Sequence, residues 1–108
     1  MLVMGFFKLR KPAGMSDKEF YTVWQKEAEA ALEAVKQGAI KAIWKVAGNP
    51  WVIAVLDVGV GDDIDHALQG LPIWKLGYQQ IVESIDWIPL RPYENWAEDL
   101  KRLAAEAP

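Results

Sequence analysis

Residues 39–58, which read AIKAIWKVAGNPWVIAVLDV, decide the fold of this chain. Residues 39–47 and 51–58 are rich in β-branched and aromatic residues, which favour β-strands. Between these two stretches, Gly48-Asn49-Pro50 has the residue types of a tight turn. Because the linker is so short, we predict two neighbouring antiparallel strands joined as a hairpin.

A strand and a helix are predicted before the hairpin. Residues 2–9 are almost all apolar and predict a strand, which the turn residues at 11–14 end. Ser16 and Glu19 have the spacing of a capping box, in which two side chains bond to free backbone donors at a helix start. The Ala-, Glu- and Lys-rich stretch that follows predicts a helix up to Gly38, which supplies a left-handed stop.

A helix, a strand and another helix are predicted after the hairpin. Asp62 is the predicted cap of a short helix, with Asp65 in its first turn, and residues 70–72 (Gly-Leu-Pro) end it. Residues 78–88 predict the last strand, which prolines follow. Residues 93–107 form a charged stretch with one apolar face and predict an amphipathic helix.

The predicted order of elements is β-α-β-β-α-β with an extra C-terminal helix. This order is that of the ferredoxin-like split βαβ fold. We therefore expect an α+β protein with a four-stranded antiparallel sheet and both main helices on one face. We divide the chain into a ferredoxin-like α+β barrel domain at residues 1–92 and a C-terminal helical tail at residues 93–108.

The second face of the predicted sheet is apolar. A solvated face gives an alternation of apolar and polar residues, but the strands at 39–47 and 51–58 carry apolar residues on both faces. Large exposed apolar surfaces mark interfaces, and dimers are the commonest assembly. We expect a second copy to pack on this face, as a homodimer or higher homo-oligomer; the alternative is that the tail helix folds back over it.

Length and composition exclude several classes of protein. The 108 residues suit one domain, and a 52% apolar content excludes overall disorder. The formal charge of −3 argues against a nucleic-acid partner, and no apolar run is long enough to cross a membrane. With no cysteine and one histidine, disulfides, thiol catalysis and a multi-histidine metal site in one subunit are excluded. We expect a soluble, cytoplasmic protein that binds a small molecule.

Six tryptophans are an unusual number for so short a chain. A domain of this size buries only about two thirds of the surface of its unfolded chain. We therefore expect some of these rings to line a cavity or to meet a second subunit.

Residues 38–48, GAIKAIWKVAG, and residues 53–58, IAVLDV, carry a further pattern. It consists of a glycine, a basic segment, an aliphatic-Trp-basic triplet, a second glycine and an Asp-Val pair that ends the next strand. Together with the Lys26-Glu27 pair, this pattern resembles the muconolactone Δ-isomerase family over residues 15–74. The resemblance implies a dimeric α+β barrel that shifts protons in small unsaturated lactones of aromatic catabolism without a cofactor or metal. Residues 73–78 differ from the family's pattern, so the substrate stays open.

Glu27 is our candidate for the general base. The helix predicted after Ser16 has an apolar stripe with helical spacing, and Glu27 lies inside it, seven residues after Phe20 and three after Trp24. A carboxylate that faces an apolar interior has a raised pKa, which suits a general base. We expect that interior to be a hollow enclosed by two copies of the sheet. Otherwise Glu27 extends to water or pairs with a lysine.

Lys45 and Lys41 are the predicted catalytic partners of Glu27, on one face of the second strand. Enolisation of a lactone develops negative charge on the carbonyl oxygen, which an ammonium group stabilises. Trp44 matches the tryptophan of the resembled family and is expected to bind substrate through its ring or its indole N–H. In the alternative interpretation, the lysines are solvated and Trp44 is a core residue.

Three further residues are candidates for substrate binding. Trp24 and Trp74 are predicted pocket walls by position, and Asp57 resembles a residue of the family, although an aspartate at a strand end often closes a turn. His66, the only imidazole, has the helical phase of acidic neighbours, so we expect it at the surface or at a subunit boundary.

We therefore predict a cofactor-independent isomerase, similar to muconolactone isomerase, that uses general acid/base catalysis. The alternatives are a cofactor-free monooxygenase, a polyketide-cyclase-like enzyme on an aromatic substrate, and a non-enzymatic protein that binds a small ligand.

Overall fold

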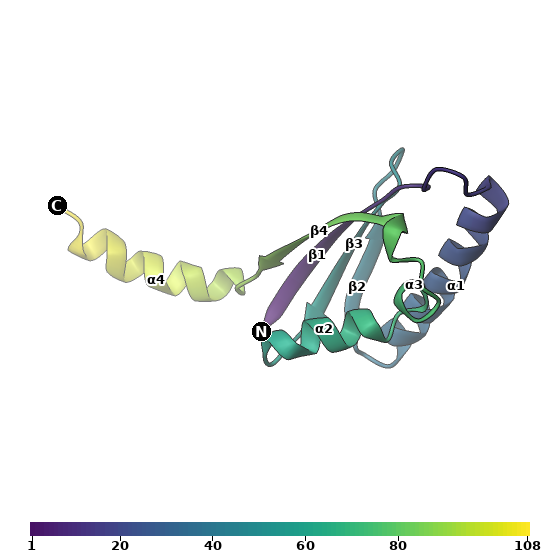
Figure 1. Cartoon of the computed structure of the whole chain (residues 1–108). Helices are drawn as coiled ribbons and strands as arrows, with labels where there is room; N and C mark the ends of the chain where they lie inside the picture. The colour runs from purple at the N-terminus through teal and green to yellow at the C-terminus, as the bar shows by residue number, and fades with distance from the viewer.

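The computed structural model describes all 108 residues and shows a four-stranded antiparallel sheet with helices on one face (Figure 1). The elements follow one another as β1 (Leu2–Leu9), α1 (Asp17–Lys36), β2 (Ile40–Lys45), β3 (Trp51–Asp57), α2 (Gly61–Gln69), α3 (Pro72–Lys75), the single-turn helix η1 (Gln79–Ile81), β4 (Val82–Pro89) and α4 (Tyr93–Glu106). The strand order is β2-β3-β1-β4, with β1 paired antiparallel to both β3 and β4. This arrangement confirms the predicted ferredoxin-like fold class.

Helix α1 begins and ends as its local sequence predicts. The Ser16 side chain accepts a hydrogen bond from the backbone N–H of Glu19 at 3.1 Å, which satisfies one free donor of the first turn. At the other end, Gly38 has a φ of +82°, a conformation that glycine adopts at little cost. Between these ends, α1 buries Phe20, Val23 and Ala31 against the sheet and its connections.

Three predicted boundaries were wrong. Helix α2 starts at Gly61 rather than after an Asp62 cap, and Asp63 closes the turn before it by accepting hydrogen bonds from two preceding N–H groups. A further helix, α3, starts at Pro72, because proline at the first helical position has its φ preset for a helix. The last strand begins at Val82 rather than at residue 78, since residues 79–81 form a single helical turn.

The core consists of two clusters on the helix-covered face of the sheet. One joins Val3, Ala54 and Leu56 of the strands to Ala31 of α1, and the other joins the end of β1 to Phe20, Val23, Ile73 and Ile81. Helix α2 contributes no buried residue to either cluster. It therefore stands away from the sheet instead of packing tightly on it.

The opposite face of the sheet, which we call the outer face, is apolar as predicted. Side chains alternate along a strand, so the residues between the buried ones on β1 and β3 point away from the helices: Met4, Phe6, Lys8, Trp51, Ile53 and Val55. Phe6 and Trp51 have ring centroids 5.7 Å apart, and the Lys8 ammonium lies 4.9 Å from the Trp51 ring. No element of the chain covers this face in Figure 1.

Helix α4 projects away from the sheet (Figure 1), so the alternative in which the tail folds back over the outer face was wrong. The chain measures 60 Å along its longest axis as a result. The apolar side chains of α4, Trp96, Leu100 and Leu103, are each about 40% exposed. No helix in the structure has the length and apolar character that a membrane span requires.

Candidate active site

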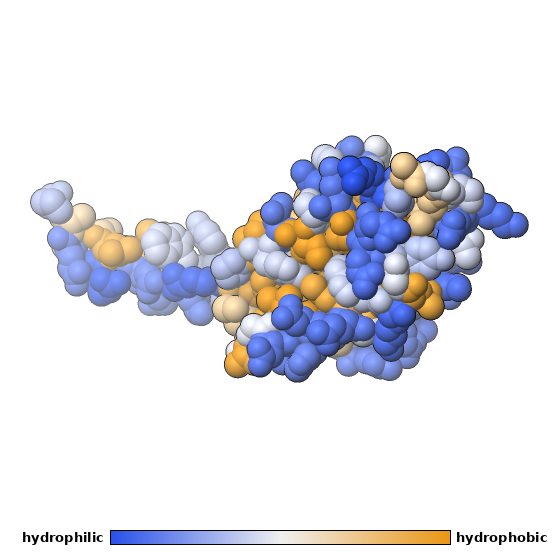
Figure 2. Space-filling model, in the orientation of Figure 1, coloured by the Kyte–Doolittle hydropathy of each residue, from blue (hydrophilic) through white to orange (hydrophobic).

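A hollow of about 650 Å³ lies between the helix-covered face of the sheet and the helices α1, α2 and α3. We call it the central hollow. Hydrophobic residues make up 22 of the 26 that line it, and Figure 2 shows apolar residues exposed between α2 and the strands. Such a volume and lining are typical of small-molecule sites.

The central hollow belongs to one chain. The prediction that two copies of the sheet enclose it was wrong, because the lining comes from the helix-covered face and from the helices of the same chain. The physical reason is the position of α2. Since α2 buries none of its residues, the space that it would otherwise fill stays open.

Glu27 reaches the central hollow from α1. It lies one turn after Val23 and one turn before Ala31, which are both buried, and its own side chain is half-buried. Its Oε2 accepts a hydrogen bond of 2.9 Å from the backbone N–H of Ile73. This N–H is free because Ile73 is in the first turn of α3, where backbone donors have no partner within the helix.

The surroundings of Glu27 act on its acidity in two opposite ways. Burial disfavours the charged carboxylate and is the larger effect, so it raises the pKa of Glu27 above its ordinary value. The hydrogen bond from Ile73 favours the charged form and offsets part of this rise. The Oε1 atom makes no hydrogen bond within the chain and is free to meet a ligand.

The structure places the two predicted lysines differently. Lys45 ends β2 opposite Val52 and lines the central hollow at its exposed edge, where its Nζ donates to the Val46 carbonyl at 3.2 Å. Lys41 is exposed and does not line the hollow. A register shift between Ile40 and Ala42 makes Lys41 an extra residue in the strand pairing, so the structure does not bring the two lysines together at the hollow.

All three predicted tryptophans contact the central hollow. Trp24 on α1 and Trp74 on α3 are partly buried in its wall. Trp44 lines the edge of the hollow from β2 but remains 60% exposed. In register it pairs with Ile53 of the outer face, so it is not the core tryptophan of the alternative interpretation.

Asp57 and His66 lie at the far end of the site. Asp57 does not line the central hollow; it forms an ion pair of 3.0 Å with the N-terminal ammonium group and lines a smaller adjoining depression. His66 is exposed on α2, as predicted, and borders both the hollow and this depression.

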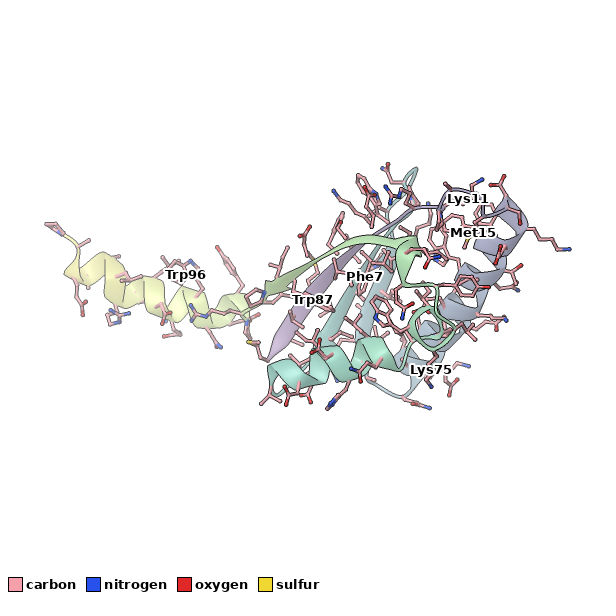
Figure 3. All side chains as sticks on the ribbon, in the orientation of Figure 1. Phe7, Lys11, Met15, Lys75, Trp87 and Trp96 are labelled. Atoms are coloured by element: carbon pink, nitrogen blue, oxygen red, sulfur yellow. The ribbon has the colours of Figure 1, made fainter.

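Sequence reasoning missed three contributors to the central hollow. Phe7 and Trp87 lie side by side on β1 and β4 (Figure 3), with ring centroids 5.6 Å apart in an edge-to-face arrangement. Their meeting depends on the register between two strands that are far apart in the sequence. The third contributor is the Ile73 N–H, and Pro72 was the available signal, since proline favours the first position of a helix.

The arrangement suits proton transfer in an apolar environment. A half-buried carboxylate with a raised pKa and one free oxygen faces a hydrophobic space, while Lys45 and His66 are the other titratable side chains in the lining. No group of three or more carboxylate or imidazole side chains lies close enough together to hold a metal ion.

Comparison with known proteins gives a family match and a fold match. The family model described as muconolactone delta-isomerase matches residues 1–95. A crystal structure of muconolactone isomerase superposes with a TM-score of 0.68 at 21% identity, covering 85% of this chain and 90% of that one.

A second solved structure has the same fold. It is the 5-chloro-2-hydroxyhydroquinone dehydrochlorinase of Burkholderia phenoliruptrix AC1100 in complex with 2,5-dihydroxybenzoquinone. It superposes with a TM-score of 0.60 at 11% identity over 88% of this chain and 98% of that one. No curated protein sequence matches the chain.

Proposed function

The chain belongs to the muconolactone delta-isomerase family, and from this premise we propose that it is a cofactor-independent isomerase that shifts a proton in an unsaturated lactone or a related carbonyl compound. The observation that carries the proposal is the half-buried Glu27 carboxylate at the wall of an apolar hollow. A raised pKa brings a carboxylate closer to the acidity that a general base needs near neutral pH.

The proposed reaction needs one base and no oxidant. The Oε1 of Glu27 takes a proton from a carbon that the substrate carbonyl acidifies, and the C–H electron pair moves into a dienolate. The resulting Glu27 carboxylic acid returns the proton to another carbon of the dienolate, which completes the isomerisation. Throughout, the Ile73 N–H holds Oε2, so the carboxylate keeps one orientation.

The negative charge on the dienolate oxygen needs a donor. We propose that the Lys45 ammonium or the Trp44 indole N–H supplies it, because both residues line the hollow. Trp24 and Trp74 form walls that position the substrate. Lys41 and Asp57 were also predicted as site residues from the sequence. They lie outside the central hollow and take no part in this mechanism.

We further propose that residues 1–92 form the catalytic domain and that a second copy covers the outer face. The family match ends at residue 95, just inside α4, which supports the domain division. The uncovered Phe6, Trp51 and Ile53 side chains support a homodimer or higher homo-oligomer. The cytoplasmic location stays a prediction.

The decisive experiment follows isotopes in a lactone substrate. Muconolactone and the uncharged α-angelica lactone are incubated with the protein in D₂O, and NMR measures deuterium incorporation and the position of the double bond. The proposal expects deuterium in the product without consumption of O₂.

A cofactor-free monooxygenase is the second candidate, because tryptophans wall much of the hollow. In the same experiment under ¹⁸O₂, labelled oxygen in the product would identify this activity. Recovery of every ligand unchanged would instead identify a binding protein.

A further inference from the structure

The central hollow is large for a one-ring lactone. Muconolactone has about ten non-hydrogen atoms; even if each took the share of a water molecule, about 30 Å³, they would occupy about 300 Å³. The hollow has about 650 Å³. A one-ring substrate would leave more than half of this space without contact to the apolar lining, and unfilled space forfeits dispersion contacts.

The walls of the hollow suit flat aromatic surfaces. Trp24 and Trp74 face it from α1 and α3, and the edge-to-face pair of Phe7 and Trp87 faces it from the sheet. Aromatic rings pack on one another in offset or edge-to-face arrangements that add to the effect of buried area. A substrate with fused rings would meet such partners on both sides of the hollow.

The charges around the hollow do not suit a carboxylate deep inside it. Lys45 and His66, the only side chains of the lining that can carry a positive charge, are both exposed at the edge, and Lys45 already donates to the Val46 carbonyl. Glu27, farther in, is itself an acid. A second carboxylate near Glu27 would lose hydration and would repel the base.

Resting on the proposed function, we infer that the natural substrate is an uncharged carbonyl compound with three fused rings. The reaction balances as before: Glu27 removes a proton from a carbon that the carbonyl acidifies and returns it to another carbon or to the enolate oxygen. No oxidant or co-reactant takes part. The fused rings fill the hollow between the sheet and the helices, and the polar end points toward Lys45.

A probe series that varies ring number tests this inference. The three probes are α-angelica lactone with one ring, β-tetralone with two and anthrone with three, the last kept under nitrogen. All are uncharged and have a C–H group acidified by a carbonyl. Quenching of tryptophan fluorescence measures binding, and NMR in D₂O measures proton exchange at the acidic carbon.

Affinity should rise about tenfold or more with each added ring, because each ring buries further apolar carbon. Muconolactone, which carries a carboxylate, should bind more weakly than α-angelica lactone. If α-angelica lactone binds as tightly as anthrone, the inference that the substrate has fused rings is overturned. If muconolactone binds more tightly than α-angelica lactone, the inference that the substrate is uncharged is overturned.

A variant on α2 tests whether the fused-ring ligand binds in the central hollow. Ala67 is exposed and lines the hollow, so Ala67→Phe adds a ring to the space without disturbing the buried core. It should weaken anthrone binding about tenfold or more and weaken the binding of the smaller α-angelica lactone by less. Ala97→Phe on α4, which is exposed and outside the hollow, is the matched control and should change neither. Equal anthrone affinity in the Ala67 variant and the wild type would contradict the inference.

Binding and exchange also separate this inference from the proposed function. If affinity rises with ring number but no probe exchanges its proton, the fused-ring inference stands and the isomerase proposal fails. If α-angelica lactone exchanges its proton and binds as tightly as the larger probes, the isomerase proposal stands and the fused-ring inference fails.

Discussion

Replacement of Glu27 by glutamine is the most direct test of the proposed catalysis. The glutamine side chain has the same shape and keeps an oxygen that accepts the Ile73 N–H, so the contact between α1 and α3 survives. The amide cannot take a proton from carbon. Loss of a general base lowers rates by about 10²–10⁴, which is a rise in the activation free energy of about 3–5 kcal/mol.

The assay is the initial rate of deuterium exchange into α-angelica lactone, with binding measured in parallel. We expect Glu27→Gln to lower kcat by at least about a hundredfold while the affinity changes little. Glu29→Gln, an exposed residue of α1 outside the hollow, is the matched control and should keep the wild-type rate. A Glu27→Gln protein that is folded and exchanges within about tenfold of the wild-type rate would refute the assignment of Glu27 as base.

The raised pKa of Glu27 predicts the direction in which the free energy of unfolding changes with pH. Burial makes the folded protein hold this proton more tightly than the unfolded chain, where the pKa is near its usual value of about 4.3. The free energy of unfolding therefore falls as pH rises from the unfolded pKa through the higher folded pKa. Glu27→Gln removes this dependence, so its stability relative to wild type should increase over the same interval. The exchange rate should instead rise with pH as Glu27 loses its proton.

The remaining predictions concern the fold and assembly. Gly5→Ala would place a Cβ 2.7 Å from the Trp87 ring and 2.8 Å from the Phe7 ring. It should therefore lower the free energy of unfolding, measured in urea, by about 1–3 kcal/mol. Gly61→Ala, whose Cβ would have nothing within 4 Å, is the control and should change this free energy by less than about 0.5 kcal/mol. Hydrogen bonds from the N–H groups before α2 lower the pKa of Asp63, so Asp63→Asn should lower the melting temperature at pH 7, and the difference should vanish as pH falls through the folded pKa. Ile88 of β4 is exposed and pairs with Met4, so it lies on the outer face. Ile88→Asp puts a charge on this face and should convert the proposed dimer to a monomer in light scattering. An unchanged mass would count against that interface. Removal of residues 93–108 should leave probe binding intact. If the shortened protein no longer binds the probes, the proposed domain division is wrong.

Local patterns carried most of the fold prediction. The Ser16 cap before α1, the glycine at its end, and the β-branched and aromatic residues of the hairpin strands act through interactions within a few residues. Glu27 was found for the same reason, since helical phase is set by the 3.6-residue repeat and places it on the stripe that faces inward. The boundaries of α2 and β4 were wrong because turns and single helical turns leave weaker patterns than long periodic segments.

The sequence by itself determined which elements form and which face of α1 carries the carboxylate. Tertiary structure alone decided what that carboxylate meets: the Ile73 N–H, 46 residues away, and a hollow that exists because α2 stands off the sheet. It also decided that Lys41 stays outside, through an irregularity in the pairing of β2 with β3. The physical reason is that helical and strand periodicity act between near neighbours in the chain, whereas strand register and the spacing between layers depend on how distant side chains pack together.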